Sequence, residues 1–137
     1  MRNKWSSFLL VLIFGFGVVF GITTGAMADN IRIGVASPFT GDLAAYGDNI
    51  KAGVNLKLKE INDAGGINGR KISLAMQDNK GDGTESVNAM TTLIGSDKVV
   101  AVIAPVTSTN TLKIKKSAKK YKIPSISPTA TNDKVTE

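Results

Sequence analysis

Hydrophobic and polar positions follow two different periods along the chain, and the changes between them outline a repeating order of strands and helices. Four short apolar runs predict β-strands, at residues 31–36, 71–77, 99–104 and 123–127. Three longer segments repeat apolar side chains every three or four positions and predict amphipathic helices, at residues 48–64, 84–95 and 110–121. Asp48 and Thr84 are the expected caps of the first two helices, and Gly65 and Gly66 are expected to end the first.

Strands that alternate with helices at this spacing are typical of a parallel sheet with helices on both faces, which indicates the α/β class. The run 99–104 is almost entirely apolar, so we expect it to form a central strand that is covered on both sides. Crossovers between parallel strands are right-handed, and this rule favours the strand order 2-1-3-4.

The stretch after the third predicted strand carries hydrogen-bonding side chains in unbroken series, at Thr107, Ser108, Thr109, Asn110 and Thr111. In a sheet of order 2-1-3-4 the direction of connection reverses between strands one and three, and a ligand crevice is expected beyond their carboxyl ends. Three loops meet there, at residues 37–47, 105–109 and 128–132. The amides of a first helical turn have no partner within the helix, so together with the hydroxyls of Ser108 and Thr109 they can form an anion site.

Two interpretations of this series stay open on the residues alone. Neither G-x-G-x-x-G nor G-x-x-x-x-G-K-S/T occurs, and the bulky segment 105–109 does not suit a pyrophosphate, so a carboxylate is the better anion for such a site. The alternative is that these side chains only cap the helix, for which one of them would be sufficient.

The amino-terminal segment has the layout of a cleavable secretory signal. A basic start precedes an apolar run over residues 8–22, and the sequence A-M-A at 26–28 supplies the small residues of a cleavage site. The alternative, a membrane anchor, needs ~20 apolar residues, and this run is shorter. We therefore expect residues 1–28 to be removed and residues 29–137 to form the exported domain.

Composition narrows the chemistry of that domain. The chain has no histidine and no cysteine, which argues against a zinc site, a disulfide and a Cys/His nucleophile. A lipoprotein needs a cysteine at the cleavage point, where Asp29 stands, so we expect a soluble product. The net charge of +6 falls to +4 without the two basic residues of the signal, which suits one ordinary domain and gives no evidence for a polyanion partner.

Lysines cover the third predicted helix and its end, at Lys113, Lys115, Lys116, Lys119, Lys120 and Lys122. Binding to nucleic acid or to an anionic membrane is one interpretation of this pattern. No aromatic platform is interleaved with the lysines, and an exported protein would not meet nucleic acid. We interpret the lysines as a solvated helix face and expect no nucleic-acid partner.

Several short motifs occur together along the chain: P-x-x-G followed by Tyr-Gly, the turn I-N-x-x-G-G-I-x-G, an Asp-Asn pair after the second strand, and two segments after the third and fourth strands, at residues 38–41, 46–47, 61–69, 78–79, 102–111 and 126–133. In this order they resemble the amino-terminal part of the branched-chain amino-acid-binding proteins of ABC transporters, in which the last two are binding segments. The resemblance covers residues 30–137 in order and without large gaps.

This resemblance implies a two-lobed clamshell, of which the chain matches the incomplete first lobe up to its fourth strand. It also implies that Ser108 donates its hydroxyl and amide to the α-carboxylate of an amino acid, with Thr131 bonding to the ammonium and carboxylate through its hydroxyl. Thr129 would offer its backbone carbonyl to the ammonium, and Tyr46 would line the side-chain pocket. No cofactor is implied. The implied partner is an inner-membrane ABC permease, the implied location is the periplasm, and the full-length protein is expected to be a monomer.

The resemblance leaves the ligand and the class of protein open. Thr129 stands where family members often have a smaller residue, and relatives bind amides, urea or aromatic acids on the same scaffold. A sensor domain without transport is one alternative. An enzyme is another, but Asp42 is the main carboxylate of the crevice loops and has no general-base partner. If the chain ends at Glu137, the second lobe is missing, and we expect weak or absent binding.

Overall fold

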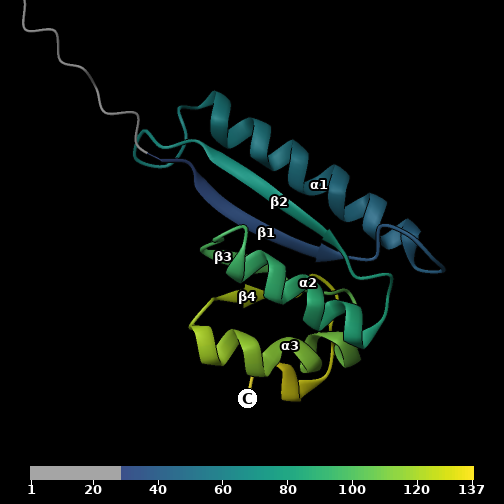
Figure 1. Ribbon diagram of the computed structural model, residues 1–137. Coiled ribbons are helices and arrows are strands. Elements are labelled where there is room, and N and C mark those ends of the chain that lie inside the picture. The colour runs from purple at the N-terminus through teal and green to yellow at the C-terminus, as the bar shows by residue number, and fades with distance from the viewer. Residues whose placement is uncertain (1–28) are drawn as a thin grey trace, which may run out of the picture.

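The computed structural model describes residues 29–137, so the expected signal peptide at residues 1–28 lies outside the described part of the chain. Strands and helices alternate in the predicted order (Figure 1): β1 (Ile31–Ser37), α1 (Ala44–Asp63), β2 (Ile72–Asp78), α2 (Gly83–Gly95), β3 (Ala101–Ile103), α3 (Ser108–Tyr121), β4 (Ser125–Ile126) and a short 3-10 turn, η1 (Asp133–Val135). Within residues 29–137 no helix has the length and apolar character needed to cross a membrane.

The strands form one parallel sheet in the order β2-β1-β3-β4, which confirms the predicted topology. Ile33 lies between Leu74 of β2 and Ala101 of β3, and Ile103 pairs with Ile126 of β4. Because all strands run in the same direction, their carboxyl ends share one edge of the sheet. The loops that follow β1, β3 and β4 therefore start from this edge.

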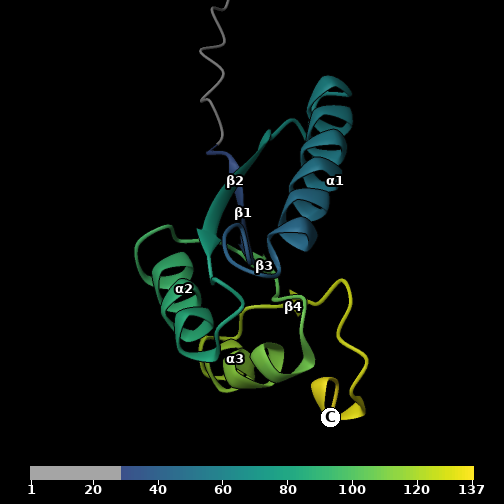
Figure 2. The same ribbon diagram turned by 90° about the vertical axis from the view of Figure 1, so that its right-hand side faces the viewer.

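The hydrophobic core lies between the sheet and the pair α2 and α3, on the face opposite α1 (Figure 2). Its fully or nearly fully buried members are Ala36, Ala89, Met90, Leu93, Val99, Val102, Ala104 and Ile114. Gly34 lets α2 approach β1 closely, because a Cβ at this position would stand 3.0 Å from Leu93 Cδ1. The apolar positions of α2, β3 and α3 thus form one core layer on this face.

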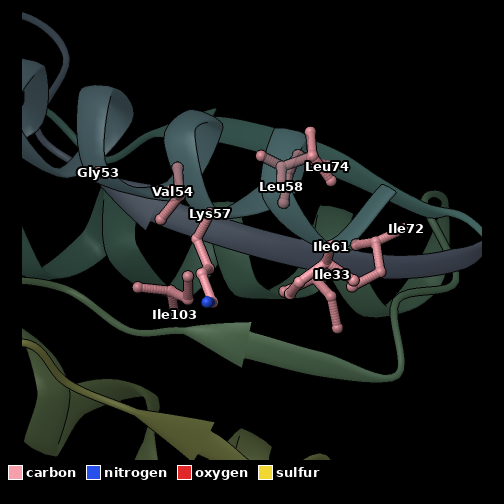
Figure 3. Close-up of a pocket in the computed structure, with 9 residues that line it drawn as sticks. All are labelled: Ile33, Gly53, Val54, Lys57, Leu58, Ile61, Ile72, Leu74 and Ile103. Atoms are coloured by element: carbon pink, nitrogen blue, oxygen red, sulfur yellow. The ribbon is translucent and has the colours of Figure 1, made fainter. Parts of the chain in front are cut away.

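The α1 face of the sheet is covered only in part. A groove of about 270 Å³ runs beside α1 (Figure 3), lined by Ile33, Gly53, Val54, Lys57, Leu58, Ile61, Ile72, Leu74 and Ile103. Ile103 is half-buried, and its neighbour Ile126 in β4 is 70% exposed. The prediction that the third strand is covered on both sides is therefore wrong on this face. Right-handed crossovers from β2 to β3 to β4 put both connecting helices on the other face.

Several element ends differ from those that the periodicity predicts. Helix α1 begins at Ala44 and not at Asp48, and no side chain caps it. Asp82, and not Thr84, caps α2, with its carboxylate accepting from the amides of Thr84 at 2.7 Å and Glu85 at 2.9 Å. Helix α3 begins two residues earlier than predicted, at Ser108. Strands β3 and β4 are shorter than the runs that predict them. Ala104 and Val106 stay buried past the end of β3, whereas both residues of β4 are exposed.

Candidate ligand-binding site

The start of α3 faces the carboxyl edge of the sheet, and Thr107 is its cap. The Thr107 side chain accepts a hydrogen bond from the amide of Asn110 at 3.3 Å, and its carbonyl accepts the amide of Thr111 at 3.0 Å. The amides of Ser108 and Thr109, in the first turn, have no carbonyl four positions back within the helix. Since capping is performed by Thr107, the hydroxyls of Ser108 and Thr109 are left for other contacts.

The hydroxyl of Ser108 ties the α3 start to the segment after β4. Its Oγ accepts the backbone N–H of Thr131 at 3.2 Å and that of Asn132 at 3.3 Å. Both bonds use Oγ as the acceptor, so the hydroxyl proton is not spent on them. Two accepted N–H bonds also polarise the hydroxyl and make that proton a better donor. Ser108 Oγ therefore keeps a proton that it can donate, next to the first-turn amides of α3.

Two further hydroxyl groups, from the segment after β4, hold the two segments together. Thr129 Oγ1 donates to the carbonyl of Val106, and Ser127 Oγ donates to the carbonyl of Pro105 at 2.8 Å. Ser127 Oγ also accepts the amide of Ala130 at 3.2 Å. Thr111 Oγ1 lies 2.9 Å from the same Pro105 carbonyl, within its own segment. Within the hydroxyl series, Ser108 therefore makes the closest bonds to the loop after β4.

A hollow of about 190 Å³ with a mixed apolar and polar lining lies beside these loops. Leu43, Tyr46, Val106, Thr107 and Thr129 line it. Tyr46 lies in the first turn of α1, which follows β1, the strand paired with β3. Its side chain is 53% exposed. Segments that follow three different strands therefore meet at one hollow, as the predicted switch point requires.

Two glycines explain why Tyr46 can stand there. A Cβ on Gly47 would lie 2.1 Å from the carbonyl oxygen of Pro38, so only glycine lets α1 begin against this loop. Gly41 has a positive φ of 82°, a conformation that side chains disfavour, and it turns the loop toward α1. The P-x-x-G and Tyr-Gly motifs thus shape the backbone that carries Tyr46.

Asp78, the last residue of β2, binds this same loop. Its Oδ1 accepts the amides of Phe39 and Lys80, each at 2.9 Å, and its Oδ2 accepts the hydroxyl of Thr40. Burial raises the pKa of the Asp78 carboxyl, but the hydrogen bond from Thr40 and those from backbone amides outweigh it, so the pKa lies below its ordinary value of 3.8. The amides of Glu85 and Thr84 likewise lower the pKa of Asp82.

Four of the five residues predicted for the site form two pairs in the structure, and the fifth, Thr109, belongs to neither pair. Ser108 bonds to the backbone of Thr131, and Thr129 lines the same hollow as Tyr46. Thr109 is exposed in the first turn of α3, beside Ser108.

Sequence reasoning missed two walls of the hollow, Leu43 and Val106. Val106 lies inside the predicted crevice loop, directly before the hydroxyl series, so its place could have been inferred. Leu43 and Tyr46 stand three positions apart, a spacing that puts two side chains on one side of a helix. The apolar periodicity excludes this spacing from the helix, because it predicts that the helix begins only at Asp48.

The arrangement is suited to binding a small molecule that is charged at one end and apolar at the other. Free amides, a hydroxyl proton and the positive end of the α3 dipole attract an anionic group. The hollow beside them offers the side chains of Leu43, Tyr46 and Val106 to an apolar group. Among residues 29–137 no three Asp, Glu, His or Cys side chains gather into a metal-binding cluster.

A family model described as "Periplasmic binding protein" matches residues 30–137. Among curated proteins, the chain is 35% identical over 127 residues to the "Amino acid binding protein" of Pseudomonas aeruginosa, covering 93% of this chain and 34% of the relative. It is 34% identical over 121 residues to the "Leu/Ile/Val-binding protein homolog 3" of Brucella melitensis, covering 88% and 32%. The chain thus spans about one third of the length of these relatives.

Solved structures agree with these sequence matches. The branched-chain amino acid transporter substrate binding protein LivJ from Streptococcus pneumoniae, solved in complex with isoleucine, superimposes with a TM-score of 0.75 at 41% identity. That match covers 78% of this chain and 31% of the other. The leucine binding protein LivK from Thermotoga maritima matches with a TM-score of 0.72 at 31% identity, covering 78% and 30%. Those relatives are named as binding proteins and not as enzymes.

Proposed function

The chain belongs to the periplasmic binding protein family, and from this premise we propose that it is the first part of a lobe that captures an amino acid. The ligand is an amino acid with a branched apolar side chain, and the protein delivers it to an ABC permease. Residues 1–28 act as a cleavable export signal, and residues 29–137 form the incomplete amino-terminal lobe in the periplasm. The protein binds its ligand without changing it chemically and acts as a monomer at full length.

The observation that carries this proposal is the unspent hydroxyl proton of Ser108 beside the first-turn amides of α3. A carboxylate has two oxygens, so one can accept from Ser108 Oγ while the other accepts from the amide of Ser108 or Thr109. Charge-assisted bonds of this kind are short and about twice as strong as bonds between neutral groups. The α3 dipole adds to the attraction, because the same helix end carries partial positive charge.

The ammonium end of the ligand would lie over the segment after β4. Thr131 is exposed and its amide is held by Ser108, so its hydroxyl stands next to the carboxylate position and can bond to both charged groups of an amino acid. The hydroxyl of Thr129 is directed to the carbonyl of Val106, which leaves its own backbone carbonyl as the acceptor for the ammonium. The threonine at position 129 therefore stabilises the loop through this bond. Compared with a serine at the same position, it also narrows the hollow by one methyl group.

The chemistry of the hollow supports an apolar side chain on the ligand. Leu43, Tyr46 and Val106 supply carbon surface, and a branched aliphatic group gains about 25 cal/mol for each Å² of its surface that leaves water. Two relatives among those at 31–41% identity are solved or named with isoleucine or leucine. This agreement favours branched-chain amino acids over the amides, urea and aromatic acids that the scaffold also admits.

Transport requires a difference between the empty and loaded states that a permease can detect. One lobe leaves the ligand open to water, and closure of a second lobe would bury it among fixed dipoles. The ligand stabilises the closed state only to the extent that it contacts both lobes. The relatives are about three times longer than the segment that matches this chain. The second lobe and its hinge would therefore lie in the part of the relatives that this chain does not match.

Equilibrium dialysis of the purified chain against radiolabelled L-isoleucine tests the proposal. With one lobe, we expect weak binding with a Kd of about 1 mM, equivalent to about 4 kcal/mol. Unlabelled leucine and valine should compete, whereas L-isoleucinamide, which lacks the carboxylate, should not. Equal competition by the amide would contradict the carboxylate role of Ser108. Amino-terminal sequencing of the exported protein should begin at Asp29.

A further inference from the structure

We propose that Asp78 is a positioning residue of the ligand site, which fixes the loop at residues 38–43 and thereby the Leu43 and Tyr46 wall of the hollow. Asp78 itself does not line the hollow. The inference deepens the proposed function and rests on it for the meaning of the hollow, but the contacts of Asp78 stand independently of any ligand.

The carboxylate of Asp78 joins two loops that leave adjacent strands. Ser37 and Asp78 are paired at the ends of β1 and β2, so the chain turns away from the sheet at the same level in both strands. One bond is local, from the amide of Lys80 two positions on. The other two reach across the sheet edge, from the amide of Phe39 at 2.9 Å and from the hydroxyl of Thr40. The Asp78 side chain therefore ties the two loops together.

The two loops also pack closely where Asp78 holds them. The amide of Asn79 donates to the carbonyl of Ser37 at 3.1 Å. A Cβ on Gly41 would stand 3.5 Å from the carbonyl oxygen of Lys80, and one on Gly81 would stand 3.2 Å from Leu43 Cδ1. Leu43 thus rests against the loop after β2, and Leu43 is a wall of the hollow.

The position of the loop passes directly into the first turn of α1. The amide of Ala44 donates to the carbonyl of Gly41 at 3.1 Å, and the amide of Tyr46 donates to the carbonyl of Leu43 at 3.0 Å. No side chain caps this helix end, so the loop backbone alone sets where α1 begins. A displacement of the loop at Phe39 or Thr40 must therefore move Tyr46.

A purely structural role for Asp78 would affect stability alone, and this difference gives the test. Asp82 is the matched control, because its carboxylate also accepts two backbone amides, those of the first turn of α2, but makes none of the bonds to residues 38–43. Asp78→Ala removes all three bonds. Asp78→Asn keeps Oδ1 for Phe39 and Lys80, and its Nδ2 can donate to Thr40 Oγ1. Thr40→Val removes only the side-chain bond across the sheet edge.

The experiment is amide hydrogen exchange and aromatic NMR on the purified chain, with isoleucine affinity as a separate readout. In Asp78→Ala we expect the Phe39 amide to exchange about tenfold faster and the Tyr46 ring resonances to shift, with affinity reduced about fivefold. Asp78→Asn should restore all three signals, and Asp82→Ala should leave them at wild-type values. If Asp78→Ala does not fold, Thr40→Val provides the test. In this variant we expect the Tyr46 ring resonances to shift while the exchange rate of the Phe39 amide stays at the wild-type value.

Wild-type signals at Phe39 and Tyr46 in Asp78→Ala or in Thr40→Val would overturn the inference. So would equal changes in Asp82→Ala. If the wild-type chain binds no isoleucine, the proposed function fails, whereas the Phe39 and Tyr46 signals still decide the role of Asp78.

Discussion

The hydroxyl oxygen of Ser108 accepts the backbone N–H of Thr131 at 3.2 Å, across 23 positions of sequence. This bond joins the start of α3 to the loop after β4, the two segments that we assign to the charged ends of the ligand. In the proposed function, this hydroxyl places Thr131 through the bond that it accepts and donates its own proton to the ligand carboxylate. The placement of Thr131 and the proposed recognition of a carboxylate therefore involve the same atom.

Removing this hydroxyl should weaken both the loop and the site. In Ser108→Ala, the amides of Thr131 and Asn132 lose their acceptor but stay open to water, so we expect a loss of about 1 kcal/mol in the free energy of unfolding. Isoleucine affinity should fall at least tenfold. Urea denaturation and dialysis measure the two effects. Thr91→Ala on the exposed side of α2 is the control and should lower neither, because alanine favours the helix.

The cap of α3 should be separable from the ligand contact. Thr107→Ala removes the acceptor of the Asn110 amide, and loss of such a cap costs about 1 kcal/mol of stability. Thr107→Ser keeps the hydroxyl and should retain most of that stability in urea denaturation. Equal stability of the alanine and serine variants would contradict the assignment of Thr107 as the cap.

Two glycines of α1 should respond to alanine in opposite directions. Gly47→Ala places a Cβ 2.1 Å from the carbonyl oxygen of Pro38, so we expect loss of stability by at least 2 kcal/mol or failure to fold. Gly53→Ala meets no atom within 4 Å and should stabilise the helix by about 0.5–1 kcal/mol. Thermal unfolding of the two variants measures the effect on stability of the same substitution at two positions of one helix. Similar effects at both positions would refute the close approach at Gly47.

Acid should destabilise the chain through Asp78 and Asp82. Both carboxyls have a pKa below 3.8 in the folded state, so the unfolded state binds protons first as the pH falls. Their contribution to stability is present above about pH 3.8 and is lost as the pH drops through the lower folded-state values. Urea denaturation between pH 5 and pH 2.5 should show a shallower decline in Asp78→Asn than in the wild type. An unchanged pH slope would contradict the lowered pKa of Asp78.

The sequence predicted the sheet order and the meeting of the three loops, because apolar periods and crossover handedness are local or general rules. It did not predict the start of α1, since Leu43, Ala44 and Ala45 carry no capping side chain and the loop backbone sets that end. Nor could it divide the hydroxyl series between Thr107 and Ser108. Thr107 and Ser108 are both good capping residues, and only the position of the loop after β4 decides which hydroxyl remains for the ligand.

The most direct test of the account is an amide-resolved NMR titration of the purified chain with L-isoleucine. Binding of the carboxylate at the start of α3 predicts saturable shifts at the amides of Ser108, Thr109 and Thr131, and their absence in Ser108→Ala. The exposed amides around Thr91 on α2 should not move. Shifts confined to the groove beside α1 would contradict the assigned site. So would the absence of a shift at Ser108 when the isoleucine concentration reaches tens of times the expected Kd.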